Sequence, residues 1–348
     1  MADYMKHYTP PIALFLALAL ATIARAQQPF PAGPINPLPP PRDSTGLTPL
    51  TELGTARYKG DDGGLYGGGK NEPPAAHAKA ARKQSAEIVP RDADGKPAED
   101  GKIGVLSVGM SNTTMEYSVF KRLAEGDPEM SSRVVLVDGA QGGKTAMVWA
   151  RPESPVWQEV EARLQRAGIT PQQVQVVWLK QAEGGPGRLG EFPKHAQVLE
   201  KHLVGILNLL HQKFPNLRIA YLSSRIYAGL ATTPLNPEPY AYESAFAVRW
   251  VIRDQADGKP ELNCDPARGE VKSPLVLWGP YLWADGVRPR KSDGLVWTRQ
   301  DLSPRDGTHP SMPDGARKVA KLLLNFFKTD PYAKRWFTVE SPVAPASK

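Results

Sequence analysis

The sequence contains a single cysteine, Cys264, among its 348 residues, so no disulfide bond can form within the chain. Its cysteine and histidine residues also lack the spacing of a zinc site. The histidines His195, His202 and His211 fall in one predicted helix, at spacings of seven and nine residues that give only loosely related faces. The sequence therefore predicts neither a metal site nor a bound cofactor.

An apolar run long enough to cross a membrane is also lacking. The most prominent run, from Ile12 to Ala24, has 13 residues, whereas a membrane-spanning helix needs about 20. Lys6 precedes this run and Ala24-Arg25-Ala26 ends it, which is typical of a secretory signal peptide. We expect cleavage after Ala26 and a periplasmic or secreted protein without a stable membrane span. A short anchor helix is the alternative.

Neither the basic nor the acidic residues are concentrated in one part of the sequence. The 43 Lys and Arg residues exceed the 36 Asp and Glu residues, but they are scattered and form no stripe. This distribution does not favour a nucleic-acid partner. With 41% hydrophobic and 23% charged residues, the composition is that of a globular protein and excludes general disorder. It does not determine the oligomeric state.

Composition divides the chain into five parts. After the signal peptide (1–26), residues 27–50 carry eight prolines in 24 positions and predict an extended tether. Residues 51–101 are rich in glycine, alanine and charge, and predict a loop-like extension over the domain. The domain itself is expected at 102–337, with an insertion at about 228–301, and a short tail follows at 338–348.

Short apolar runs alternate with amphipathic segments along the domain. The expected strands are 103–108, 134–137, 174–179, 217–222 and 275–278, and the expected helices are 115–124, 156–167, 195–214, 244–254 and 315–327. Strands that are apolar at nearly every position are typical of a parallel sheet buried on both faces. The pattern predicts an α/β fold, a three-layer α/β/α sandwich. Ligands of such sheets bind beyond the carboxyl ends of the strands.

Two loops carry residues suited to nucleophilic catalysis. Ser111 stands at the turn between the first strand and its helix, where its hydroxyl and its N–H can both face a ligand. Asp306 and His309 stand just before the last helix, and a carboxylate at this spacing can orient an imidazole that serves as base. Each motif can also be interpreted without catalysis, since Ser111 can cap a helix and Asp-Gly is common in turns.

On these residues the sequence resembles the SGNH (GDSL-like) hydrolases, from about residue 103 to 327. The resemblance implies a flavodoxin-like sheet, a nucleophile at Ser111, and an Asp-x-x-His pair at Asp306 and His309. It also implies an oxyanion hole formed by Ser111, Gly143 and a side-chain amide after the third strand, here Gln181 in place of the usual asparagine. Met110 replaces the aspartate often found before the serine. The Gly-x-Ser-Asn motif is more similar to the sialate O-acetylesterase and acetylxylan esterase branch.

The resemblance implies an exported serine esterase, a carboxylic ester hydrolase with a Ser-His-Asp catalytic triad. Its substrate would be a small-molecule or glycan ester with a short acyl group, such as an O-acetyl group on a carbohydrate. Two alternatives stay open: a lipase or lysophospholipase of the same superfamily, and a non-catalytic glycan-binding surface protein. The aromatic residues between 228 and 301 suit either stacking on sugar rings or an ordinary core.

Overall fold

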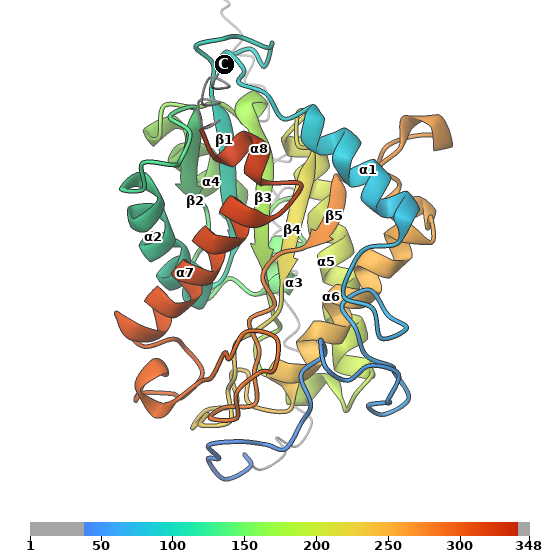
Figure 1. Cartoon of the computed structure of the whole chain (residues 1–348), viewed down its shortest axis with the longest axis vertical. Helices are drawn as coiled ribbons and strands as arrows, with labels where there is room; N and C mark the ends of the chain where they lie inside the picture. The colour runs from blue at the N-terminus through green and yellow to red at the C-terminus, as the bar shows by residue number, and fades with distance from the viewer. Residues whose placement is uncertain (1–37, 340–348) are drawn as a thin grey trace, which may run out of the picture. The chain divides into compact units, whose positions relative to one another are not determined.

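The computed structural model describes residues 38–339 (Figure 1). The predicted signal peptide, the first part of the predicted tether (27–37) and most of the tail (340–348) lie outside the described residues. In the part of the chain that the structure describes, no helix combines the length and the apolar character that a bilayer span requires.

A five-stranded parallel sheet forms the centre of the fold, in the order β2-β1-β3-β4-β5. Its strands are β1 (Ile103–Gly109), β2 (Val134–Asp138), β3 (Val174–Lys180), β4 (Ile219–Ser223) and β5 (Leu275–Trp278). Every residue of β1, β3, β4 and β5 is buried, which explains why their sequences are mainly apolar. The predicted strands and the parallel α/β architecture are confirmed.

Eight α-helices surround the sheet. They are α1 (Ala75–Ala86), α2 (Ser111–Glu125), α3 (Ala146–Trp149), α4 (Val156–Arg166), α5 (Lys194–Lys213), α6 (Tyr240–Ala256), α7 (Asp314–Thr329) and α8 (Lys334–Phe337) within the described residues. Short 3-10 helices span Pro171–Gln173, Pro186–Leu189, Pro260–Leu262, Pro266–Arg268 and Arg299–Asp301. The five helices predicted from periodicity correspond to α2, α4, α5, α6 and α7.

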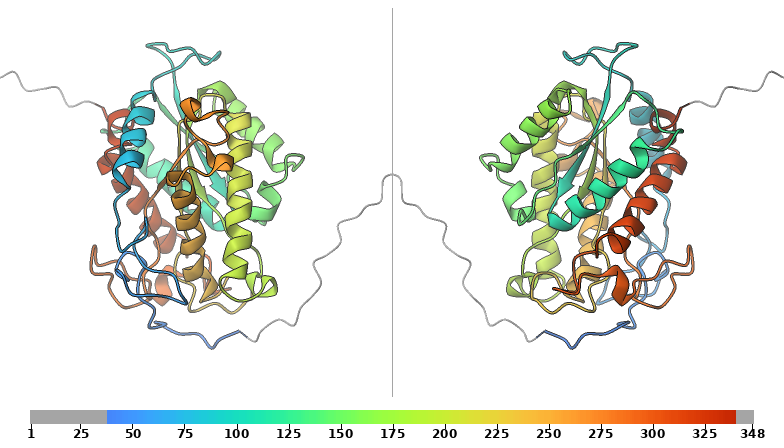
Figure 2. Two further views of the ribbon diagram at one scale, coloured as in Figure 1. Left: turned by 90° about the vertical axis from the view of Figure 1, so that its right-hand side faces the viewer. Right: turned by 90° about the vertical axis from the view of Figure 1, so that its left-hand side faces the viewer.

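The helices form one layer on each face of the sheet. Figure 2 shows α1, α7 and α8 on one side and α4, α5 and α6 on the other. In α7 the apolar stripe of Val319, Leu323 and Phe327 is fully buried against the sheet side. Burying one such side chain stabilises a fold by roughly 1.5–3 kcal/mol. The layers therefore follow from helices with one apolar stripe packing on a sheet with two apolar faces.

The extension at 51–101 is not only loop, because it contains α1. The buried residues of this helix are His77, Ala81 and Ser85, and His77 Nε2 lies 2.8 Å from the carbonyl oxygen of Val276 in β5. These side chains are small or polar, so their spacing of four gives no apolar stripe in the sequence. The prediction of a loop was wrong for residues 75–86.

Residues 38–50 do not form a free tether, because they are anchored to the loop after β5. The backbone N–H groups of Thr45 and Gly46 donate to the two oxygens of Asp285, at 2.6 and 2.9 Å. Leu50 is fully buried, and its N–H donates to the hydroxyl of Tyr281. For these residues the prediction of an extended tether was wrong.

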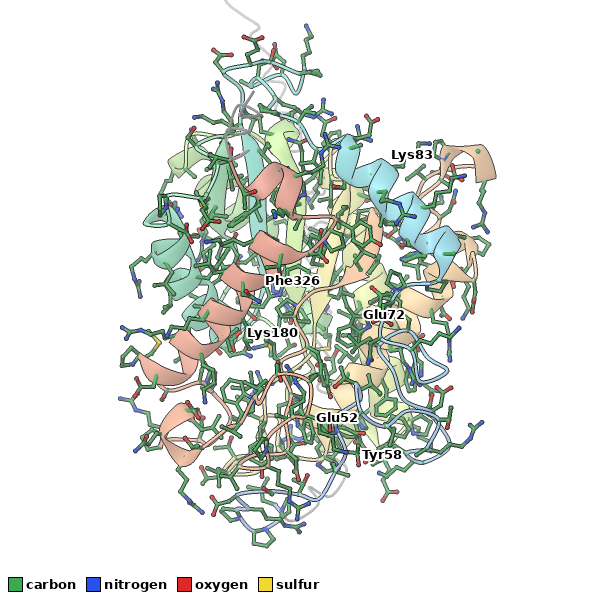
Figure 3. All side chains as sticks on the ribbon, in the orientation of Figure 1. Glu52, Tyr58, Glu72, Lys83, Lys180 and Phe326 are labelled. Carbon is green, nitrogen blue, oxygen red and sulfur yellow. The ribbon has the colours of Figure 1, made fainter. Side chains whose placement is uncertain are left out.

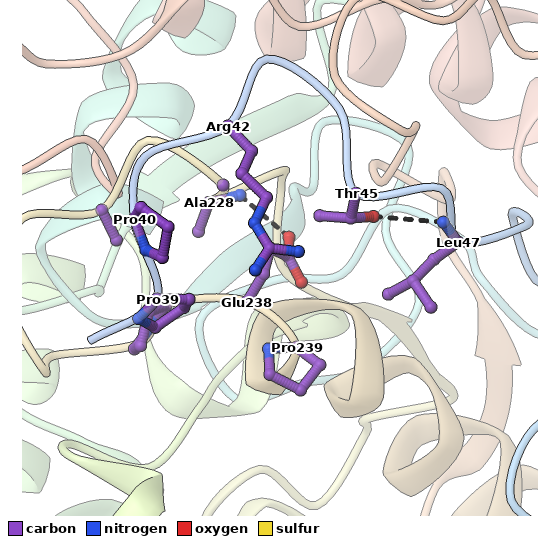
Figure 4. Close-up of a pocket in the computed structure, with 11 residues that line it drawn as sticks. Pro39, Pro40, Arg42, Thr45, Leu47, Ala228, Glu238 and Pro239 are labelled. Carbon is purple, nitrogen blue, oxygen red and sulfur yellow. Dashed lines mark hydrogen bonds between the residues drawn. The ribbon is translucent and has the colours of Figure 1, made fainter. Parts of the chain in front are cut away.

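The anchored segment and the loop at 228–239 line an open pocket of about 220 Å³ (Figure 4). Its walls are largely proline, alanine and leucine side chains, and they include the polar residues Arg42 and Glu238. Burial raises the pKa of Glu238 to about 7, against hydrogen bonds from Trp283 and the N–H groups of Ala228 and Tyr242. Neither Ser111 nor His309 lines this pocket.

The interval 228–301 is not an insertion, because it supplies α6 and β5 to the sandwich. Its aromatic residues are mainly core. Tyr242, Phe246, Trp250, Trp278, Tyr281, Trp283 and Trp297 are buried, and Tyr240 is partly exposed. The Tyr240 ring stands edge-on to His195, with ring centroids 4.8 Å apart. Of the two interpretations of these rings, the structure therefore favours the core.

Candidate active site

Ser111 lies where β1 passes into α2, at the carboxyl edge of the sheet. Strand β1 lies between β2 and β3, and the order of the strands reverses here: the chain passes from β1 to β2 through α2, and then from β2 across to β3 through α3 and α4. Such a point in a parallel sheet leaves a crevice between neighbouring loops. Gly109 is required at the end of β1, because a Cβ atom there would collide with the side chain of Thr113 in the first turn of α2. The tight turn presents Ser111 as the first residue of the helix.

His309 bridges Ser111 and Asp306. The Ser111 Oγ atom lies 2.6 Å from His309 Nε2, and His309 Nδ1 lies 2.7 Å from Asp306 Oδ2. With a proton on Nδ1, the histidine donates to the carboxylate and accepts from the serine hydroxyl. The structure therefore brings together the three residues that the sequence placed in two distant loops.

Backbone groups hold Asp306 as an anion. Its Oδ1 atom accepts the N–H groups of Thr308 and His309, both at 3.0 Å. Partial burial raises the pKa of Asp306, but these two bonds and the bond from the His309 ring lower it further, so the net shift is below the usual value. Gly307 makes the turn with a φ of +62°, and a Cβ atom there would collide with the carbonyl of Leu230.

The turn after β2 runs past the serine. A Cβ atom at Gly142 would lie 3.9 Å from Ser111 Cβ, and the N–H of Gln141 donates to the carbonyl of Gly109 at 3.0 Å. Gly143 has a φ of +73° and open space where a Cβ would stand. This conformation favours glycine and leaves the backbone exposed beside the nucleophile.

Gln181 follows β3 and reaches the same turn. Its Nε2 atom lies 3.5 Å from the carbonyl of Lys144, next to Gly143, and the side chain is 1% exposed. The Oε1 atom has no hydrogen-bond partner among the described residues. At 3.5 Å the bond to Lys144 is weak, so one N–H of the amide is only loosely held.

Beneath these loops lies a buried ion pair that sequence reasoning missed. Lys180 Nζ lies 2.5 and 2.6 Å from the two carboxylate oxygens of Glu116, and both side chains are fully buried. Burial raises the pKa of Glu116, against the charge of Lys180, and burial lowers the pKa of Lys180 to about 8. Figure 3 labels Lys180 among the interior side chains. A lysine at the end of a mainly apolar strand was the available signal, since a buried lysine requires a partner.

Replacing Lys180 with methionine is expected to lower the free energy of unfolding by about 3–5 kcal/mol, because Glu116 then loses its counter-charge in the interior. The double variant Lys180→Met with Glu116→Leu should recover most of that loss. Urea unfolding of both variants measures the two values. If the single variant loses less than about 1 kcal/mol, the pair does not stabilise the end of β3 as described.

Two of the three histidines of α5 pair with carboxylates and not with each other. His195 Nε2 lies 2.7 Å from Glu243 Oε2, and His202 Nδ1 lies 2.7 Å from Glu183 Oε1. Between residues 38 and 339, no group of three or more His, Cys, Asp or Glu side chains is arranged to hold a metal ion.

Neither a family model nor a curated protein matches the chain. Solved structures do show a likeness. A Bacteroides fragilis protein provisionally described as an acylhydrolase is 14% identical, with a TM-score of 0.35, over 73% of this chain and 96% of that one. An extracellular lipase from Streptomyces rimosus is 11% identical, with a TM-score of 0.31, over 64% and 99%. A salicylyl-acyltransferase from a tetracycline biosynthetic pathway is 14% identical, with a TM-score of 0.32, over 65% and 54%. At identities and TM-scores this low, the solved structures do not assign an activity to this chain, and only its own side chains can indicate one.

Proposed function

We propose that this protein is a serine ester hydrolase of the SGNH (GDSL-like) type that acts through an acyl-enzyme. The observation that carries the proposal is the chain of contacts from Ser111 Oγ to His309 Nε2 and from His309 Nδ1 to Asp306, at 2.6 and 2.7 Å. A serine hydroxyl becomes a competent nucleophile when a neighbouring base accepts its proton, and the base works best when a carboxylate fixes its tautomer.

In the proposed reaction, Ser111 Oγ attacks the ester carbonyl while its proton passes to His309 Nε2. The negative charge that develops on the carbonyl oxygen is stabilised by the N–H groups of Ser111 and Gly143 and by the Gln181 amide. His309 then returns the proton to the leaving alcohol, and the acyl group stays on Ser111. Water, deprotonated by His309, attacks the acyl-enzyme and releases the acid by the same steps in reverse.

We further propose that the substrate is a short acyl ester, in particular an O-acetyl group on a carbohydrate, and that the enzyme works after export. Support for the substrate comes from the Gly-x-Ser-Asn motif around Ser111 and the amide at Gln181. Support for export comes from the apolar run from Ile12 to Ala24 and the cleavage motif Ala24-Arg25-Ala26 that ends it. The lipase alternative predicts a preference for long acyl chains, and the non-catalytic alternative predicts no turnover of any ester.

A series of p-nitrophenyl esters of increasing acyl length, followed by acetylated xylan and O-acetylated sialic acid, tests this proposal. We expect the highest kcat/KM for the acetyl ester and release of acetate from at least one glycan. A preference for long acyl chains would establish the lipase alternative. An absence of turnover on every ester would favour a binding protein.

Gln181→Ala is expected to lower kcat by about 10²–10³-fold with little change in KM, because an oxyanion donor acts mainly in the transition state. Gln175→Ala is the matched control, since that equally buried amide bonds the backbone at Val89, at the opposite end of β3, and should leave kcat near the wild-type value. Steady-state kinetics on p-nitrophenyl acetate measure both. If Gln181→Ala raises only KM, the amide binds substrate and is not part of the oxyanion hole.

A further inference from the structure

Arg225 is a buried cation directly behind the loop that carries Asp306 and His309. It follows β4 by two residues and is 2% exposed. Its Nη2 atom donates to both the carbonyl oxygen and the Oγ1 atom of Thr308, each at 2.7 Å. Its own backbone N–H donates to Ser244 Oγ of α6 at 3.2 Å, which ties the arginine to the opposite helical layer.

Thr308 connects this arginine to the proposed catalytic residues. It stands between Asp306 and His309, is fully buried, and donates its own N–H to Asp306 Oδ1. Its hydroxyl also lies 3.3 Å from the carbonyl of Asn236. Backbone bonds from Thr232 to Asp306 and from Ser303 to His309 also hold this segment, at 2.9 and 2.8 Å. Between those two residues, the Arg225 guanidinium makes the shortest bonds to Thr308.

The surroundings of Arg225 are charged but offer no other strong bond. Burial lowers the pKa of Arg225, and the carboxylates of Glu116, Glu238 and Asp306 raise it again. Among the described residues none of these carboxylates lies within ion-pair distance of the guanidinium, and its Nε atom has no hydrogen-bond partner. A buried cation bonded through one nitrogen to a neutral threonine costs stability, because no counter-charge in the described part of the chain lies at ion-pair distance to offset its desolvation.

We propose that Arg225 is a positioning residue that sets the place at which His309 Nε2 meets Ser111 Oγ. This inference rests on the proposed function of Ser111 and His309. Arg225 does not touch the reacting atoms and acts only through Thr308. Misplacement of a reacting group by about 1 Å costs on the order of 10² in rate, so a change at Arg225 is expected to affect kcat more than KM.

Kinetics of Arg225→Met test the proposal. We expect kcat on p-nitrophenyl acetate to fall by about 10²-fold with KM nearly unchanged. Arg225→Lys should retain most of the activity, because one ammonium can donate to both Thr308 atoms as Nη2 does. The matched control is Arg249→Met, which removes an equally buried arginine that pairs with Asp61 and Asp62. It is expected to lower stability while leaving kcat unchanged.

A background lacking the base separates positioning from a structural role. In His309→Ala, the further change Arg225→Met should leave the residual turnover unaltered, because the group that Arg225 positions is already absent. In the wild-type background, the far-downfield NMR signal of the His309 Nδ1 proton should shift or broaden in Arg225→Met and persist in Arg249→Met. Equal losses of turnover in both backgrounds, or wild-type kcat in Arg225→Met, would overturn the proposal.

Thr308→Val and Arg225→Lys decide the question if Arg225→Met does not fold. Thr308→Val removes one of the two acceptors and keeps the carbonyl, so an intermediate loss of kcat is expected, and a wild-type kcat contradicts the proposal. The activity of Ser111→Ala distinguishes a failure of this proposal from a failure of the proposed function. If Ser111→Ala retains activity, the hydrolase mechanism is wrong, whereas loss of activity in Ser111→Ala with full activity in Arg225→Met rejects only the role of Arg225.

Discussion

Ser111→Ala is expected to lower ester turnover by at least about 10⁴-fold while the protein stays folded. The Ser111 hydroxyl lies 2.6 Å from His309 Nε2 and can form an ester with the acyl group. The oxyanion donors remain in the variant, so a small residual rate above that in water should persist. Turnover of p-nitrophenyl acetate measures the loss of activity. The thermal unfolding midpoint of the same preparation shows whether the protein stays folded.

Ser118→Ala provides the matched control for that variant. Ser118 lies on the same helix, and its hydroxyl bonds only the carbonyl of Met115, at 3.2 Å, within the described residues. Its replacement should leave turnover within about twofold of the wild type, because Ser118 is only partly buried and makes no hydrogen bond with the proposed catalytic residues. Near-normal turnover in Ser111→Ala would exclude the acyl-enzyme mechanism.

Asp306→Asn is expected to lower kcat by about 10⁴-fold, although it changes only one atom. The Oδ1 position accepts two backbone N–H groups, from Thr308 and His309, so the amide oxygen of asparagine must occupy that position. The amide nitrogen then faces His309 Nδ1 and donates to it. The histidine is forced into the tautomer with its proton on Nε2, which cannot accept the proton of Ser111.

The pH dependence of turnover in Asp306→Asn does not by itself identify the tautomer, because the mechanism can change with pH. The tautomer of His309 is therefore best observed directly. Nitrogen NMR of labelled histidine distinguishes protonated Nδ1 from protonated Nε2. We expect Nδ1–H in the wild type and Nε2–H in the variant. An unchanged tautomer together with normal kcat would mean that Asp306 does not orient the base.

The sandwich could be predicted from the sequence because its signals are local. Strands such as β3 are apolar at nearly every position, and helices such as α5 repeat leucine at three and four residues. The positions of Ser111 and His309 followed from the same pattern, since both stand in loops at the edges of predicted elements. Their contact across 198 positions could be anticipated only through the resemblance.

The features that were missed depend on partners far away in the sequence. Asp285 anchors Thr45 across 240 positions, and nothing near the prolines of that segment indicates the contact. Lys180 and Glu116 are separated by 64 positions, so the apolar run before Lys180 indicates a buried lysine but does not identify its partner. Arg225 has the same character, since its acceptor Thr308 lies 83 positions away. Patterns in one sequence indicate which apolar residues are buried, but they rarely indicate which buried polar groups pair with each other.

Reaction with a fluorophosphonate, followed by mass spectrometry of the peptides, tests the proposed nucleophile most directly, because the reagent leaves a stable adduct on an activated serine. We expect one adduct per chain, on the peptide that contains Ser111, with loss of esterase activity in proportion to labelling. Asp306→Asn should react far more slowly, and Ser111→Ala should not react at that peptide. An adduct on a different residue, or full esterase activity in a completely labelled protein, would contradict the assignment of Ser111.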